Sequence, residues 1–286
     1  MTKKILLIIL SVLLVFVIVF ALYTYVIKRP SNDRKWIAGQ DIPVRVERTQ
    51  NPNQILMNNI RDFRFQGGKP YTINYQNRDY DLNQIDNVWF LVEPFNGWSG
   101  VAHTFFIFDF KNQEPIALSV EARREVGENY SAFWGLFSNY EVIYIWSTEK
   151  DILNRMVSER SEVYMYRLHI TKDSSKKLFE ELVAETEALE TKPAFYNTFT
   201  SNCTNLLAKA ANKIKEDSIP WHFSYILPGF SDSYLYSLGY LETYDWDFEN
   251  LKKESLVTSY IKDHLDDEDK TFSLGLRIRR FGSDTK

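Results

Sequence analysis

A long apolar run near the start of the chain is the feature that most constrains how it folds. No charged residue interrupts the segment from Ile5 to Ile27. About 20 helical residues cross a hydrocarbon core roughly 30 Å thick, so the run is long enough to span a membrane. A cleaved signal peptide is the alternative, but its apolar part usually covers only about 7–15 residues and ends at a small-residue cleavage site that has no clean match here. We therefore expect an uncleaved transmembrane signal anchor over residues 1–29.

The basic residues around this run do not fix its orientation. Lys3 and Lys4 precede it, and four basic residues follow it: Lys28, Arg29, Arg34 and Lys35. A literal count by the positive-inside rule would place the body in the cytosol. The family resemblance described below favours the opposite orientation. We expect a single-pass protein of the inner (cytoplasmic) membrane whose soluble domain is periplasmic.

The composition of the remaining chain is that of a globular domain, and it excludes several classes of protein. The whole sequence is 44% hydrophobic and 25% charged, which is ordinary for a folded protein. Lysine and arginine total 34 against 38 aspartates and glutamates, so the chain lacks the basic surplus of a nucleic-acid binder. One cysteine excludes a disulfide framework and a multi-thiolate zinc site. HExxH, P-loop and GxGxxG motifs are absent from the sequence, and we expect neither a cofactor nor a metal.

The body is predicted to be an α+β domain in which an antiparallel sheet packs on a cysteine-bearing helix. β-branched and aromatic runs predict strands at 42–46, 88–92, 101–110, 116–123, 142–146 and 163–170. Apolar periodicity near 3.6 predicts helices at 150–159, 174–190 and 204–215. A polar connector is expected over 30–60 and a turn over 66–70. The domain is expected to cover 30–245, with a C-terminal extension over 246–286.

Cys203 is the only thiol in the chain, and its local sequence suits a nucleophile. It stands three and four positions before Leu206 and Leu207, so it opens the predicted helix on the inward side. Ser201 or Asn202 can cap the free amides of that helix. The positive end of the helix dipole favours the thiolate, and the amide of Cys203 is a candidate oxyanion donor. The alternative is a small buried cysteine without a chemical role.

The candidate general base is His103, which begins the apolar strand at 101–110 after the loop 96–100. A polar ring at the start of such a strand is typical of a site residue. The other histidines have structural or solvated contexts: His169, His222 and His264.

A carboxylate that would orient the imidazole is expected at Glu121, in the strand at 116–123. If this strand forms a hairpin with 101–110 through a three-residue loop, His103 faces Glu121 directly across the ladder at about 5 Å. A two-residue loop would turn Glu121 to the opposite face. The hypothesis therefore requires an odd-numbered loop or a bulge. Weaker candidates for this role are Glu125 and Arg123, and Glu121 itself has the alternative of an exposed strand charge.

Several motifs, taken together and in order, resemble one family. They are Asn59-Ile60-Arg61-Asp62-Phe63, Ala102-His103-Thr104-Phe105, Ser119-Val120-Glu121-Ala122-Arg123-Arg124-Glu125, Gly127-Glu128-Asn129-Tyr130-Ser131, Gly135-Leu136-Phe137, Tyr140-Glu141, Phe195-Tyr196-Asn197-Thr198 and Asn202-Cys203-Thr204. This pattern, over about residues 40–240, resembles the DUF4105 family, also called the Lnb N-terminal periplasmic domain.

The resemblance implies a circularly permuted papain-like (NlpC/P60-type) fold with a Cys-His-polar triad. The order His103, Glu121, Cys203 is then the papain order with the cysteine helix moved to the end, and Trp98, Asn202 and Tyr196 would line the cleft. The function it implies is a membrane-anchored cysteine hydrolase acting on a peptide, including cell-wall peptide, or on an acyl chain. The alternative function is a non-catalytic, membrane-tethered binding or assembly module that uses the same cleft.

Overall fold

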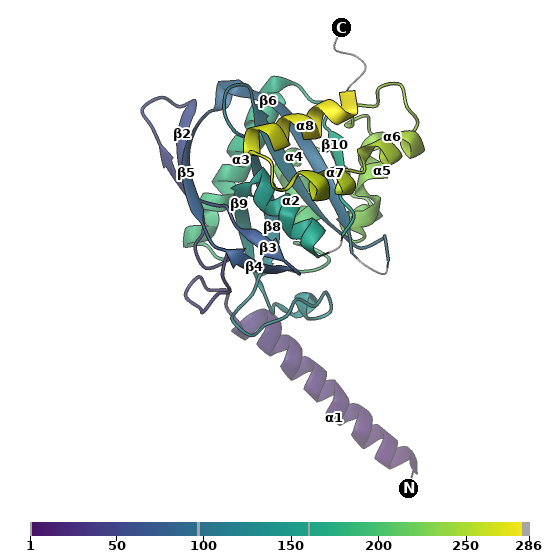
Figure 1. The fold of residues 1–286 in the computed structure, drawn as a ribbon. Helices are drawn as coiled ribbons and strands as arrows, with labels where there is room; N and C mark the ends of the chain where they lie inside the picture. The colour runs from purple at the N-terminus through teal and green to yellow at the C-terminus, as the bar shows by residue number, and fades with distance from the viewer. Residues whose placement is uncertain (1, 96–97, 160, 282–286) are drawn as a thin grey trace.

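The architecture is a helix-flanked sheet carried on one long helix. The computed structural model describes residues 2–95, 98–159 and 161–281. Helix α1 (Thr2–Leu22) projects from a body in which a sheet lies between two helical layers (Figure 1). The expected mixed α+β fold with one N-terminal apolar helix is confirmed.

The central sheet contains eight strands within the described residues, in the order β1-β2-β9-β8-β7-β6-β10, with β5 also paired to β2. Neighbouring strands are antiparallel except β2 and β9, which meet in parallel. The strand bounds are β1 Arg45–Arg48, β2 Gln54–Arg61, β5 Tyr75–Asp81, β6 Ile85–Pro94, β7 Ala102–Phe110, β8 Ile116–Arg123, β9 Glu141–Thr148 and β10 Tyr164–Arg167. Strands β3 (Arg64–Gln66) and β4 (Lys69–Thr72) form a separate hairpin around the predicted turn at 66–70.

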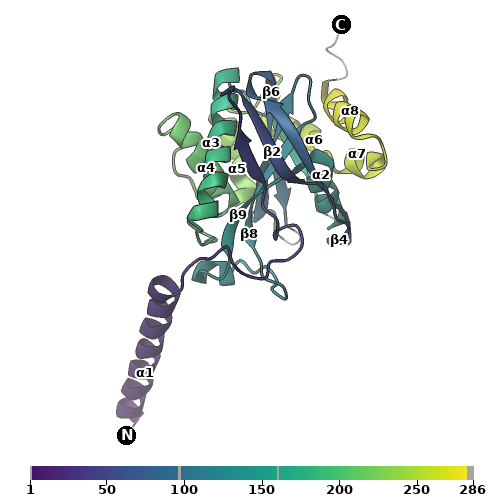
Figure 2. The same cartoon turned by 90° about the vertical axis from the view of Figure 1, so that its left-hand side faces the viewer.

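Two apolar clusters hold the layers together, one on each face of the sheet. On the first face lie α3 (Lys172–Thr191), α4 (Cys203–Ile214) and α5 (Ser231–Ser237), whose buried residues include Phe179, Leu207 and Leu235. On the second face lie α2 (Glu149–Ser158), α7 (Thr258–His264) and α8 (Asp269–Phe281), with Ile152, Ile261 and Phe272 at the centre. Figure 2 shows the two helical layers on either side of the strands.

The segment 246–286, expected to be an extension, contributes to this core. It contains α6 (Phe248–Ser255), α7 and α8. Leu251 of α6 belongs to the first cluster, and Tyr260, Ile261 and Leu276 belong to the second. The described part of the segment is therefore continuous with the domain in packing.

The prediction of a polar connector over 30–60 is wrong for the second half of that segment. The first half is anchored to the body of the protein. Strand β2 lies within it and ends at Arg61, where its guanidinium pairs with the fully buried Asp151 at 2.7 Å. Before β1, the indole of Trp36 lies under the Arg123 guanidinium at 4.3 Å. The backbone N–H of Ile37 donates to the carbonyl of Arg124, which follows Arg123 in the chain, at 3.1 Å. Polar side chains dominate this segment, but long-range pairing makes it part of the fold.

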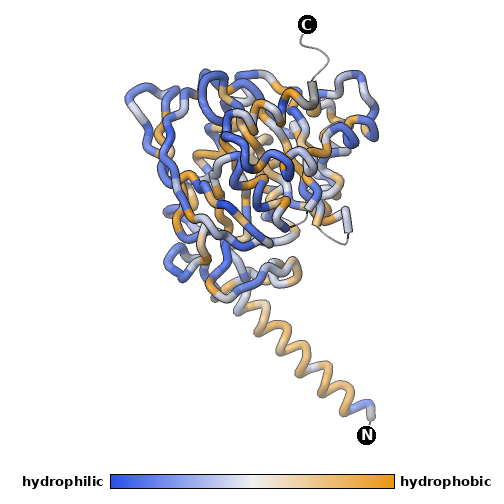
Figure 3. Tube along the Cα trace, viewed as in Figure 1, coloured by the Kyte–Doolittle hydropathy of each residue, from blue (hydrophilic) through white to orange (hydrophobic). Residues whose placement is uncertain are grey.

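The apolar run forms a continuous helix that leaves the body. A π-helical turn, Tyr23–Ile27, follows α1, and the segment Lys3–Ile27 is long and apolar enough to cross a membrane. Figure 3 shows this helix as an almost unbroken hydrophobic stretch beside a body of mixed hydropathy. None of the 18 residues that make up its most apolar stretch is buried within the protein.

Candidate active site

Cys203 is the first residue of α4, and the preceding asparagine fixes the start of that helix. The side chain of Asn202 accepts a hydrogen bond from the backbone N–H of Asn205 at 2.8 Å, which is an N-cap. The amide groups of Asn202 and Asn205 both donate to the carbonyl of Tyr225, each at 2.7 Å. The turn that carries the thiol is therefore anchored to a second segment of the chain.

His103 lies at the beginning of β7, opposite Glu93 of β6. Nε2 of its imidazole lies 2.7 Å from the hydroxyl oxygen of Ser119, on β8. Its ring also stacks on Phe105, with centroids 5.6 Å apart. These contacts hold the ring in one orientation at the end of the sheet.

Ser119 connects the imidazole to Glu121. Its hydroxyl donates to Oε1 of Glu121 at 2.9 Å, and the same carboxylate pairs with Arg155 of α2 at 2.6 Å. Burial raises the pKa of Glu121, but the Arg155 guanidinium outweighs burial and holds that pKa well below its usual range. An ionised carboxylate only accepts hydrogen bonds. The Ser119 hydroxyl must then accept from His103, so the hydrogen of the neutral imidazole is on Nε2.

The β7–β8 hairpin has the register required for this arrangement, although His103 and Glu121 are not a ladder pair. The pairs Phe105–Ser119 and Phe108–Ile116 confirm the register that follows from a three-residue loop. Beyond Phe105–Ser119 no further pair joins the two strands within the described residues, and Glu121 instead pairs with Ile143 of β9. A direct His103–Glu121 pair is therefore a wrong expectation. Strands β7 and β8 separate where α4 packs against the sheet. There the hydroxyl groups of Thr104 and Thr204, the latter on α4, form a hydrogen bond at 2.9 Å.

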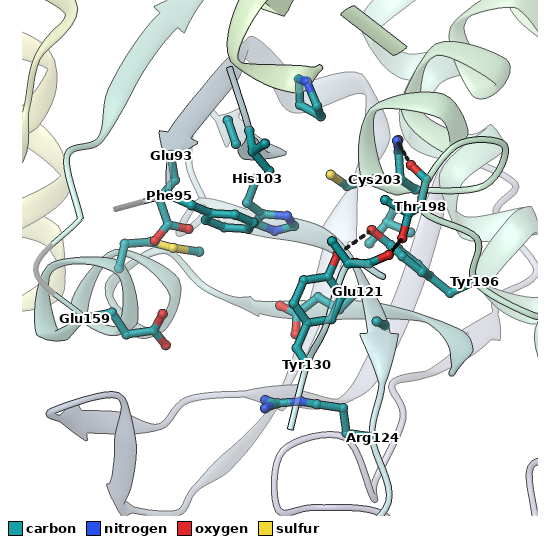
Figure 4. Close-up of a pocket in the computed structure, with 18 of the residues that line it drawn as sticks. Glu93, Phe95, His103, Glu121, Arg124, Tyr130, Glu159, Tyr196, Thr198 and Cys203 are labelled. Atoms are coloured by element: carbon teal, nitrogen blue, oxygen red, sulfur yellow. Dashed lines mark hydrogen bonds between the residues drawn. The ribbon is translucent and has the colours of Figure 1, made fainter. Parts of the chain in front are cut away.

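Cys203 and His103 open into one pocket of about 250 Å³ (Figure 4). Figure 4 shows the sulfur and the imidazole on neighbouring sides of this space, with Glu121 and Tyr130 below them. The lining combines strand, loop and helix residues: Gln40, Glu93, Phe95, Val101, Ala102, His103, Val120, Glu121, Ala122, Arg124, Tyr130, Ala132, Arg155, Met156, Glu159, Tyr196, Thr198, Asn202, Cys203, Ile226 and Pro228.

The electrostatics of the pair favour a thiolate beside an imidazolium. Burial raises the pKa of the Cys203 thiol, but the His103 imidazole and the Thr104 backbone outweigh burial and lower the pKa to about 7. Burial lowers the pKa of His103, whereas Cys203 and Glu121 raise it, and the net shift is upward. A thiol with a depressed pKa beside a histidine is typical of nucleophilic cysteines.

Of the three residues predicted to line the cleft, two line the pocket and one does not. Tyr196 and Asn202 line the pocket, and the hydroxyl of Tyr196 lies 3.5 Å from that of Tyr130. The side chain of Asn202 is buried and occupied by the cap, so its interactions are structural. Trp98 is 56% exposed and does not line the pocket; Phe95 of the same loop does.

The alternative residues lie elsewhere. Glu125 pairs with Arg34 at 2.8 Å, and Arg123 stacks on Trp36. The other three histidines are outside the pocket lining and have local partners: His169 with Glu242, His222 with Ser224 and His264 with Tyr260.

Three residues of the site have no clear signal in the sequence. Ser119 contacts the imidazole of His103, Arg155 pairs with the carboxylate of Glu121, and Glu93 faces His103. Burial raises the pKa of Glu93 to about 7, with His103 opposing that shift. Alternation along β8 puts Ser119 and Glu121 on one face of the strand. This is the only signal in the sequence for the hydrogen bonds that connect His103, Ser119 and Glu121. Among the described residues, no cluster of three or more His, Cys, Asp and Glu side chains could hold a metal ion.

Fold and site together define a membrane-associated α+β protein with a cysteine–histidine pocket at the end of an antiparallel sheet. The chain belongs to the family of Lnb N-terminal periplasmic domains, whose model matches residues 71–229. The match includes His103, Glu121 and Cys203. With one helix able to span a membrane among the residues that the structure describes, the chain fits a single-pass membrane protein with a periplasmic domain. No curated protein and no solved structure matches it, so the likeness to papain-like enzymes stays a prediction.

Proposed function

We propose that this protein is a cysteine hydrolase anchored in the inner membrane, with Cys203, His103 and Glu121 as its catalytic residues. The observation that carries the proposal is the meeting, in one pocket, of a buried thiol whose pKa is lowered to about 7 and a histidine whose pKa is raised. The permuted papain-like arrangement belongs to this proposal.

The hydrogen-bond chain assigns the proton transfers. Because Nε2 of His103 donates to Ser119, Nδ1 is the nitrogen that takes the proton of the Cys203 thiol. The thiolate attacks the carbonyl carbon of an amide or ester and forms a tetrahedral oxyanion. The imidazolium then donates its proton to the leaving amine or alcohol, and a thioester remains. Water attacks the thioester, His103 accepts its proton, and the acid is released with the thiol restored.

The first turn of α4 supplies electrostatic support for the oxyanion. The N–H groups at the start of a helix have no intrahelical partner, and Cys203 is the first residue of α4. A backbone donor directed at an oxyanion contributes about 3–4 kcal/mol to transition-state stabilisation. A peptide or an acyl ester would both present the required carbonyl.

The test is alkylation of Cys203 by iodoacetamide across pH, with the full-length protein in detergent. We expect the rate to rise with a midpoint near pH 7, and we expect His103→Gln to return the midpoint to the range of an ordinary thiol, about 8.5. His222→Gln is the matched control, because His222 lies outside the pocket lining. A wild-type midpoint near 8.5 would overturn the proposal.

Alkylation shows activation, and a second measurement tests turnover. A library of amide and ester substrates is incubated with the protein, and the acyl-enzyme is trapped with hydroxylamine. Cys203→Ser should abolish the trapped product. If Cys203→Ser retains the full biological function that deletion of the protein removes, the protein acts as a binding or assembly module instead.

A further inference from the structure

An uncharged aromatic loop lies beside the membrane-spanning helix. Residues 130–137 read Tyr-Ser-Ala-Phe-Trp-Gly-Leu-Phe and contain no charged side chain. Phe133, Trp134 and Phe137 contact one another, with ring centroids 5.2–6.2 Å apart. We call these three residues the aromatic cluster.

Two members of the cluster are exposed on the body of the protein, and the third, Phe137, is half-buried. Phe133 is 61% exposed and Trp134 51% exposed, and Phe199 of the adjacent loop is 49% exposed. The two loops are joined by hydrogen bonds, since Thr198 donates to the carbonyl of Ala132 at 2.6 Å. Phe133, Trp134 and Phe199 thus lie exposed on two connected loops, and the described chain leaves about half or more of each side chain uncovered.

Contacts with α1 set the depth of the cluster. The ring of Phe137 packs on Phe20 at 5.3 Å, and the hydroxyl of Tyr25 donates to the carbonyl of Leu136 at 3.0 Å. Phe20 precedes the end of the apolar run at Ile27 by seven residues, or about 10 Å along a helix. Figure 1 shows the short helical turn of this loop next to the body-proximal end of α1. A residue that packs on Phe20 therefore lies at the level of the lipid.

We propose that the aromatic cluster is a second membrane contact, seated in the headgroup–acyl boundary of the same bilayer that α1 spans. Tryptophan and other aromatic side chains concentrate at this boundary, and apolar side chains on a peripheral surface partition there. Insertion into lipid would bury the apolar surface of the exposed rings, which the protein itself leaves uncovered.

This contact also orients the pocket, and it holds whatever chemistry Cys203 performs. Tyr130 and Ala132 belong to the same loop and line the pocket. Seating the cluster in lipid therefore fixes the position of the pocket mouth relative to the headgroups, and the domain has two points of attachment instead of one.

The test uses spin labels on the full chain in vesicles of phosphatidylethanolamine and phosphatidylglycerol. In a Cys203→Ser background, Phe133→Cys and, separately, Asn112→Cys are labelled with a nitroxide. Asn112 is the control, because it is exposed in the β7–β8 turn, at the opposite end of those strands from His103. Collision rates with oxygen, which dissolves in lipid, and with a water-soluble nickel complex are measured by power saturation.

We expect the ratio of oxygen to nickel accessibility to be several-fold higher at Phe133 than at Asn112. Equal ratios at the two positions would overturn the proposal, because the cluster would then lie in water or await a protein partner that the vesicles do not contain. Labelling Trp134→Cys in the same way repeats the measurement at an independent position, so a local effect of one substitution cannot decide the outcome.

Discussion

Nε2 of His103 lies 2.7 Å from the hydroxyl oxygen of Ser119, on the neighbouring strand. The carboxylate of Glu121 is the next group along, accepting from Ser119 at 2.9 Å. Ser119 thus links the carboxylate of Glu121 to the imidazole of His103 by two hydrogen bonds. It stands between the two residues that the sequence predicts as catalytic partners.

Ser119→Ala should interrupt this connection. Without the hydroxyl, the imidazolium loses its link to Glu121, so the pH midpoint of Cys203 alkylation should rise from near 7 towards about 8.5. Turnover of a substrate should fall by roughly 100-fold, the lower end of what a positioned general acid–base group contributes. The measurement is the pH profile of iodoacetamide labelling.

Ser147→Ala is the matched control for that experiment. Ser147 is fully buried on β9, and its hydroxyl has no hydrogen-bond partner among the described residues. It should leave the alkylation midpoint unchanged. An unchanged midpoint in Ser119→Ala as well would remove Ser119 from the mechanism.

Glu121→Gln should destabilise the domain. The variant leaves the charge of Arg155 buried without its carboxylate partner, a loss of about 3–5 kcal/mol. Because the folded-state pKa of Glu121 lies below the unfolded value of about 4.3, this stabilisation is present above that pH and is lost as the pH falls towards the folded pKa. The difference in unfolding free energy between wild type and variant should therefore shrink below about pH 4.

Urea unfolding in detergent between pH 3 and 7 measures that difference. Glu216→Gln, at an exposed position on the loop after α4, is the control and should match wild type. A Glu121→Gln deficit that stays constant across this pH range would contradict the ionised, paired carboxylate.

Glu93→Gln should act in the opposite sense. The pKa of Glu93 is raised to about 7 by burial, so the stability tied to its protonated form is complete below its unfolded pKa and is lost as the pH rises through 7. Glutamine mimics the protonated acid. The variant should match wild type near pH 4 and exceed it at pH 9 by on the order of 3 kcal/mol.

The same unfolding measurement, carried to pH 9, tests Glu93. Glu159→Gln changes an exposed residue of the same pocket and should show no such pH-dependent gain. If Glu93→Gln is less stable than wild type at pH 9, the carboxyl is ionised and favourably paired there.

Arg277→Met should detach the C-terminal helix α8 from the sheet. The guanidinium of Arg277 on α8 pairs with Asp109 and with Glu149, the latter at 2.7 Å. Its removal leaves two buried carboxylates facing each other, at a cost of about 3–5 kcal/mol. Lys270→Met, at an exposed position on the same helix, should be neutral. Proteolysis of the C-terminal segment, followed by mass, reports the loss.

The sequence was most informative where local patterns decide structure. Strand patterns predicted the β7–β8 hairpin, and the register found is the one expected for a three-residue loop, the alternative being a two-residue loop. A cap by Ser201 or Asn202 was expected before Cys203, and Asn202 provides it. The apolar run predicted a helix able to span a membrane. These features depend on neighbours within a few residues or on one short loop.

The remaining features depend on distant partners. Strand β2 lies in a segment rich in polar residues and is paired with β1 and β5 on either side, and this pairing cannot be deduced from its own residues. The parting of β7 and β8 beyond Ser119, which replaces a direct His103–Glu121 contact, arises where α4 is placed against the sheet. Arg155 joins the site from α2, 34 positions away from Glu121 along the chain.

The anchored segment between α1 and β1 has a consequence for how this protein meets its partners. Arg34 pairs with Glu141, and Trp36 lies beneath Arg123, so the domain does not swing on a loose tether. The molecule samples its surroundings by lateral diffusion and by rotation about the bilayer normal, with the thiol held at a constant height. For the proposed hydrolase, encounters with substrate would then be governed by the surface density of carbonyl groups within one thin shell above the bilayer, and a bulk concentration would be a poor guide to its rate.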